Sequence, residues 1–194
     1  MVARLAVVLS LIALSACAGG NRNDADLGPS GRDLATASTD LAGGGTPPDG
    51  GAAASTVRIN EVDPNGPSET TDPDWIELVN LGAATVDLSS WKLRDDNAAS
   101  LTAFPAGTTI PPGGYLVVWA NDNMAMMAGG VSMPFKLSGS KGDEVHLVAP
   151  DGSEADMTSF GANAVATGKS WGRSPSGTGA FKVLDTPTRG MVNP

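Results

Sequence analysis

Oxygen-bearing side chains are concentrated in one stretch of the sequence, the acidic loop at residues 61–77. Calcium binds six to eight oxygen ligands, which carboxylates, amides and main-chain carbonyls can supply. The side chains that we single out as candidate ligands are Asp63, Asn65, Asp72 and Asp74. The spacing is not that of an EF-hand, and DPNG at residues 63–66 is also a good turn sequence. We therefore favour a turn with solvated acids and keep a Ca²⁺ site as the alternative.

Two glutamates at the ends of this loop have a different setting. Glu61 and Glu77 each stand inside an apolar run that reads as a strand, and the two strands should be neighbours. A carboxylate that faces the interior needs a compensating partner. We expect structural ion pairs with Arg58, Lys92 or Arg94 rather than catalysis.

A second group of candidates is built from methionines. Met124, Met126 and Met127 lie in a glycine-containing loop at residues 124–133, which ends at Met133. Thioethers are soft ligands that suit copper(I), but methionine is also a flexible packing residue that forms adaptable contact surfaces. We favour packing, then partner contact, then metal binding. With the nearby Trp119, the three loop methionines are the candidate partner-binding residues.

Enzyme chemistry finds little support in the sequence. A serine triad needs a histidine base and a zinc site needs several histidine, cysteine or carboxylate ligands, yet the sole histidine is His146, within an apolar run. We expect it to be a solvent-facing or hydrogen-bonded strand residue. A hydrolase that uses only Asp and Glu remains the alternative. We predict no catalytic residues and no cofactor beyond the Ca²⁺ alternative.

The only cysteine, Cys17, indicates where the protein acts. Arg4 precedes an apolar run at residues 5–16, which has the character of a secretory signal and is too short for a transmembrane helix. Residues 14–17 read LSAC and resemble the lipobox of bacterial lipoproteins. The resemblance implies cleavage after residue 16 and a lipid anchor on Cys17 in the cell envelope. The aspartate that signals inner-membrane retention in some bacteria is absent at Ala18, which favours the outer membrane.

The next part of the chain is a predicted spacer. Residues 17–55 are rich in glycine, alanine and aspartate and contain no aromatic residue, so they cannot bury enough apolar surface to fold. Within them Asp-Leu recurs every seven residues, starting at Asp26. We interpret residues 17–55 as a disordered linker behind a signal peptide at residues 1–16.

The charge of the remaining chain limits its partners. From Thr56 onward there are 16 acidic and 9 basic residues, a net charge of −7. Nucleic-acid binding requires lysines and arginines gathered on one face, whereas these are scattered singly. We expect no nucleic-acid partner.

The elements that carry these candidates are short apolar runs separated by glycine and proline, which is typical of an all-β domain. The predicted strands are residues 57–62, 75–80, 85–88, 91–94, 101–104, 115–120, 144–149, 157–160, 170–173 and 181–184. No helical apolar stripe is present.

Several motifs in a fixed order resemble the lamin tail domain. They are INEV at residues 59–62, DWIELVN at 74–80, DLSSWKL at 87–93, FPAGTTIPPGGYLVV at 104–118, GDEVHL at 142–147, GKSWGR at 168–173 and TPTRGMVN at 186–193. The resemblance covers residues 56–194 and implies an immunoglobulin-like β-sandwich. Such domains serve as interaction modules in nuclear lamins, and the resemblance does not imply a reaction. Two departures are Ser90, where glycine is usual, and Thr188-Arg189, which interrupts a closing turn.

These observations predict a lipid-anchored, non-catalytic envelope module that binds a protein or polymer. The alternative is a metal-handling or hydrolytic lipoprotein that uses the acidic loop or the methionine loop. The partner, the leaflet and the oligomeric state do not follow from the sequence.

Overall fold

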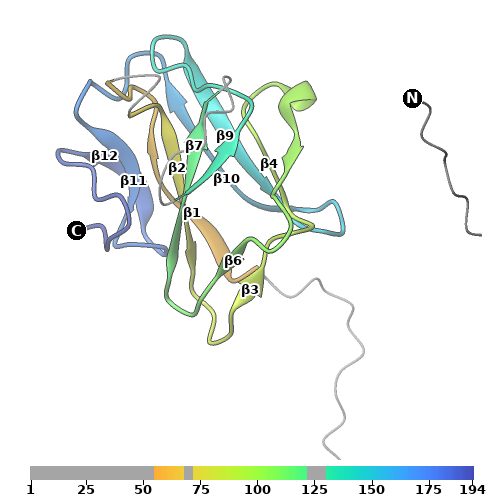
Figure 1. The fold of residues 1–194 in the computed structure, drawn as a ribbon. Coiled ribbons are helices and arrows are strands. Elements are labelled where there is room, and N and C mark those ends of the chain that lie inside the picture. The colour runs from red at the N-terminus through yellow and green to blue at the C-terminus, as the bar shows by residue number, and fades with distance from the viewer. Residues whose placement is uncertain (1–54, 68–71, 122–129) are drawn as a thin grey trace, which may run out of the picture. The chain divides into compact units, whose positions relative to one another are not determined.

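The computed structural model describes residues 55–67, 72–121 and 130–194. In this part of the chain the backbone forms twelve short strands and one 3-10 helix (Figure 1). No helix among the described residues is long and apolar enough to cross a membrane. The predicted signal peptide and the predicted linker up to residue 54 lie outside the described residues.

Six strands form the larger sheet, in the order β12-β11-β1-β2-β7-β8. Neighbouring strands are antiparallel except β7 and β8, which are parallel. Their bounds are β1 Val57–Asp63, β2 Trp75–Asn80, β7 Tyr115–Ala120, β8 Gly130–Met133, β11 Ser170–Ser174 and β12 Ala180–Leu184. Because β1 pairs with both β2 and β11, this sheet joins the beginning and the end of the domain.

Four strands form the smaller sheet, in the order β10-β9-β4-β5, and two more form a separate ribbon. The bounds in the smaller sheet are β4 Lys92–Arg94, β5 Thr102–Ala103, β9 Gly142–Val148 and β10 Glu154–Gly161. The ribbon consists of β3 Val86–Asp87 and β6 Thr109–Ile110, and the 3-10 helix η1 is Ala98–Ser100.

The hydrophobic core draws side chains from both sheets. Ile59, Ile76 and Val118 come from the larger sheet, and Leu93 and Leu147 come from the smaller one. Successive side chains of a strand point to opposite faces, so Glu61 and Glu77, which pair across β1 and β2, lie on the face of the larger sheet away from this core. We call it the outer face.

A β-bulge shapes β1 where it crosses the outer face. The pairing of β1 with β2 shifts between Ile59 and Glu61, which leaves Asn60 without a pairing residue on β2. A bulge inserts one extra residue and redirects the side chains around it. Asn60 is fully buried and takes part in the polar network described below.

The C-terminal segment, residues 185–194, follows β12 and returns across the outer face beside β11 and β1 (Figure 1). Gly172 of β11 makes room for it, because a Cβ atom there would stand 2.8 Å from Nδ2 of Asn193. Asn193 Nδ2 donates hydrogen bonds to the carbonyl oxygens of Asn60 (3.2 Å) and Arg173 (2.9 Å).

The structure confirms the predicted all-β, immunoglobulin-like sandwich. Each of the ten predicted strands corresponds to an observed one, whereas β6 and β8 were not predicted. The assignment of Met133 to the methionine loop was wrong. Met133 ends strand β8 and packs fully buried in the core, because β8 adds to the edge of the larger sheet beside β7.

Candidate functional site

The outer face of the larger sheet carries two buried carboxylates next to each other. Glu61 and Glu77 are 0% exposed and stand opposite one another on β1 and β2. Two adjacent carboxylates in a buried setting repel each other and lose their hydration. Their hydrogen-bond partners therefore decide whether this arrangement is stable.

Glu61 is satisfied by residues from β11 and from the C-terminal segment. Thr188 donates to it twice, from its backbone N–H to Oε1 at 2.9 Å and from its hydroxyl to Oε2 at 2.6 Å. The hydroxyl of Ser170 in β11 also donates to Oε1. All three are neutral donors.

Glu77 is satisfied in the same way. The side-chain amide of Asn60 donates to Oε1 at 2.7 Å, and the backbone N–H of Gly190 donates to Oε2. Burial raises the pKa of Glu77 to about 7, and the neighbouring Glu61 adds to the increase, while the bonds from Asn60 and Gly190 oppose it. The carboxyl therefore changes its charge near neutral pH.

The expectation of ion pairs at these glutamates was wrong for the described residues. Arg58 instead donates to the carbonyl of Ala155 at 3.1 Å, and Arg94 donates to the carbonyl of Asp95 at 2.7 Å. The C-terminal segment already provides hydrogen-bond donors to both carboxylates. Sequence reasoning missed this role of Thr188 and Gly190, because it looked for cationic partners and not for neutral donors from a distant segment.

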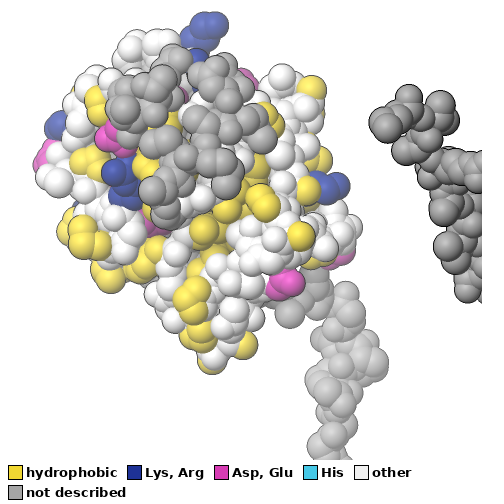
Figure 2. Space-filling view, viewed as in Figure 1, with side chains coloured by type: hydrophobic (Ala, Val, Ile, Leu, Met, Phe, Trp, Pro, Cys, Tyr) yellow, Lys and Arg dark blue, Asp and Glu magenta, His cyan; other side chains and the backbone are white. Residues whose placement is uncertain are grey.

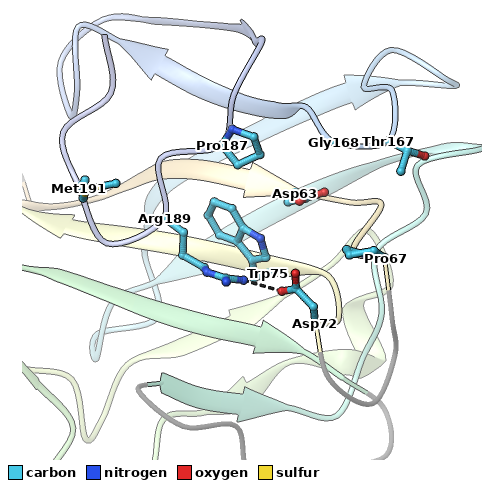
Figure 3. Close-up of a pocket in the computed structure, with 9 residues that line it drawn as sticks. All are labelled: Asp63, Pro67, Asp72, Trp75, Thr167, Gly168, Pro187, Arg189 and Met191. Carbon is cyan, nitrogen blue, oxygen red and sulfur yellow. Dashed lines mark hydrogen bonds and ion pairs between the residues drawn. The ribbon is translucent and has the colours of Figure 1, made fainter.

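Farther along the outer face, two tryptophans stand side by side beneath an arginine. Trp75 of β2 and Trp119 of β7 are directly opposite each other in the sheet. The guanidinium carbon of Arg189 lies 5.6 Å from the ring centre of Trp75 and 4.8 Å from that of Trp119. Asp72 pairs with the same guanidinium at 2.6 Å (Figure 3). We call Trp75, Trp119 and Asp72 the Trp-Asp subsite.

A pocket of about 390 Å³ opens beside this subsite (Figure 3). Its polar wall contains Asp63, Asp72 and Arg189, and its apolar wall includes Trp75 and Met191. Arg189 and Asp72 are partly exposed at its rim. The pocket therefore combines an aromatic surface, two carboxylates and one cation supplied by the C-terminal segment.

The four predicted cation ligands do not line one common pocket. Asp63 and Asp72 line the pocket beside Arg189, whereas Asn65 and Asp74 line a different one with Lys136. Within the described residues no three His, Cys, Asp or Glu side chains are grouped so that they could hold a metal ion. The Ca²⁺ interpretation stays a prediction.

The turn part of the interpretation has direct geometric support, but the expectation of solvated acids was wrong for Asp63, which is buried. The carboxylate of Asp63 accepts from the N–H of Asn65 at 3.0 Å, and that of Asp74 accepts from the N–H of Gly66 at 2.8 Å. Burial raises the pKa of Asp63, and it raises the pKa of Asp74 to about 6. Through these hydrogen bonds, Asp63 and Asp74 stabilise the loop between β1 and β2.

The candidate partner-binding residues are only partly placed. Met124, Met126 and Met127 lie outside the described residues. Trp119 is 6% exposed, so its ring is covered within the structure and not presented to solvent. Its indole edge lies against Gly130 of β8, where an added Cβ would stand 2.7 Å from Nε1.

The single histidine is a hydrogen-bonded strand residue, as expected. His146 is buried on β9, and its ring nitrogens contact two carboxylates, Glu154 at 2.6 Å from Nδ1 and Glu144 at 2.9 Å from Nε2. Both contacts hold the ring in place on the smaller sheet. Neither provides a nucleophile.

The raised pKa of Glu77 predicts how stability depends on pH. Between pH 4.5 and about 7 the folded domain keeps a proton on Glu77 that the unfolded chain has lost. The free energy of unfolding should therefore fall as pH rises through this window, by at most about 1.4 kcal/mol per pH unit from this group. Thermal melts between pH 4.5 and 8 should show the fall, and Glu77→Gln should reduce its slope.

The matched control is Asp151→Asn. Hydrogen bonds from Ser153 lower the pKa of this exposed carboxyl, so its contribution to the pH dependence lies below pH 4. The control should keep the wild-type slope between pH 4.5 and 7. An unchanged slope in Glu77→Gln would contradict the assignment.

Comparison with known proteins identifies the family to which the sequence is similar. The sequence matches the Lamin Tail Domain family over residues 51–162, and a search of curated proteins gave no match. Members are immunoglobulin-like interaction domains that are not typically catalytic. Strands β11 and β12 and the C-terminal segment follow the matched residues, although β11 pairs with β1 in the same sheet. Because the match covers more than half of the chain, this protein belongs to the lamin tail domain family.

Proposed function

We propose that this protein is a lipid-anchored, non-catalytic module of the bacterial cell envelope that binds a protein or polymer through the outer face of its larger sheet. One observation carries the proposal. The outer face already binds one segment of the chain, residues 185–194, through hydrogen bonds to Glu61 and Glu77 and through an arginine seated on the Trp-Asp subsite. A surface with these contacts suits a peptide segment that supplies backbone N–H donors and an arginine side chain.

The sequence supports the anchoring part of the proposal. The LSAC tetrad at residues 14–17 places Cys17 where a lipoprotein carries its acyl chains, and more than one chain gives a stable anchor. As a flexible coil, residues 18–55 would span roughly 30 to 40 Å. Such a tether lets the domain reach partners away from the membrane surface, and the outer membrane is the favoured location.

The surface charge supports a partner other than nucleic acid. On the face seen in Figure 2, the Lys and Arg side chains stand apart from each other, with Asp and Glu side chains between them. The net charge of −7 from Thr56 onward has the wrong sign for phosphate binding. It suits a partner that presents positive charge.

Replacement of Cys17 tests the anchor. Cys17→Ser removes the thiol that would be acylated, so the protein should move from the membrane fraction to the soluble fraction and should no longer incorporate labelled palmitate. Ser38→Ala, a change in the linker, should leave the protein in the membrane fraction. Membrane retention of Cys17→Ser with the wild-type yield would contradict the lipid anchor.

Replacement of an exposed methionine tests the binding face. Met191 is 62% exposed beside the pocket, and Met157 is 39% exposed on the smaller sheet. In crosslinking of intact cells that express the full chain, Met191→Asp should lower the yield of the crosslinked partner several-fold, because a charge there opposes apolar contact. Met157→Asp should keep the wild-type yield, and the opposite ranking would place the interface on the smaller sheet.

A further inference from the structure

We propose that the Trp-Asp subsite is an arginine-binding site, which takes a guanidinium group from a protein partner in exchange for Arg189. The inference rests on the interaction function proposed above and names the side chain that the partner presents. Nothing about the subsite requires a metal or a reaction. In this structure the subsite is occupied by the guanidinium of Arg189, which is the chemical group that we expect a partner to supply.

The chemistry of the subsite selects a guanidinium. Trp75 and Trp119 form an aromatic floor under Arg189, with 5.6 and 4.8 Å between the guanidinium carbon and the two ring centres. Asp72 supplies the carboxylate at 2.6 Å. A planar, weakly hydrated guanidinium stacks on aromatic faces and pairs with a carboxylate at the same time, which a lysine ammonium does less well.

The backbone around Arg189 is fixed on both sides. Thr188 donates its N–H to Glu61 and Gly190 donates its N–H to Glu77, and both acceptors are fully buried. Breaking such contacts would leave a buried carboxylate unsatisfied. The C-terminal segment therefore stays in place during binding.

The side chain of Arg189, in contrast, can leave. It is 38% exposed and its partner Asp72 is 39% exposed, and ion pairs at such positions contribute little to stability. Rotation of this side chain into solvent vacates the guanidinium position above the two tryptophans without moving the backbone. The subsite is thus closed by an occupant that is easily exchanged.

The pocket beside the subsite gives an incoming arginine a route and a favourable charge. It contains two carboxylates, Asp63 and Asp72, and one cation, Arg189. Burial raises the pKa of Asp63, and the nearby carboxylates of Asp72 and Glu61 add to the increase. Displacement of Arg189 by a partner arginine keeps Asp72 paired.

The test uses the full chain and a small ligand of defined chemistry. Arg189→Ala removes the competing guanidinium while the backbone contacts of Thr188 and Gly190 remain. N-acetyl-arginine amide, titrated with tryptophan fluorescence as the readout, should bind this variant about tenfold more tightly than the wild type, because an occupied site lowers apparent affinity. N-acetyl-lysine amide should bind it several-fold more weakly than the arginine ligand.

Three further variants make the result decisive. Asp72→Ala added to Arg189→Ala should abolish the gain, whereas Arg94→Ala, which removes an arginine from the smaller sheet, should bind as the wild type does. Arg189→Lys keeps the charge and should bind with intermediate affinity, so a folding defect in Arg189→Ala would not hide the effect. Equal binding with and without Asp72, or no saturable binding by Arg189→Ala and Arg189→Lys, would overturn the proposal. If the arginine proposal failed in this way while Met191→Asp still lowered the crosslinking yield, the proposed interaction face would stand and only the arginine subsite would be rejected.

Discussion

Two neighbouring buried carboxylates set the main constraint on this structure. Glu61 and Glu77 face each other across β1 and β2 with no exposed surface. Burial without partners would make both groups strongly unfavourable, and among the described residues their partners are neutral hydrogen-bond donors. Most of these donors come from the C-terminal segment and from the bulge residue Asn60. The carboxylates therefore hold the last part of the domain on the sheet.

The same constraint determines what the outer face can offer to a partner. The backbone N–H groups of the residues on both sides of Arg189 donate to buried carboxylates. The backbone at Arg189 is therefore held in place, and its side chain lies over Trp75 and Trp119. That side chain, in contrast to the backbone, is 38% exposed at the rim of the pocket.

The fold could be predicted from the sequence because alternation and turn residues act locally. The strands around Trp75 and Tyr115 follow from short apolar runs between turn residues. Strand β8 was not predicted because GVSM at residues 130–133 is a short run that becomes a strand by pairing in parallel with the preceding strand, β7. Met133 was misassigned for the same reason.

The site was harder to predict, because it depends on contacts over more than a hundred positions. The sequence places Glu61 and Glu77 in neighbouring strands, but it does not show that Thr188 and Gly190 return to them. The acidic loop drew attention to Asp72 as a cation ligand, and its observed partner is the side chain of Arg189. Local spacing could identify the acids but not the distant residues that contact them.

Amide hydrogen exchange of the C-terminal segment tests the central role of the buried glutamates most directly. The N–H groups of Thr188 and Gly190 donate to Glu61 and Glu77, whereas Val192 is 69% exposed in the same segment. Amides that donate to buried acceptors exchange through opening of the structure and so are protected. The account predicts slow exchange at Thr188 and Gly190 and fast exchange at Val192. Equally fast exchange at all three amides would contradict it.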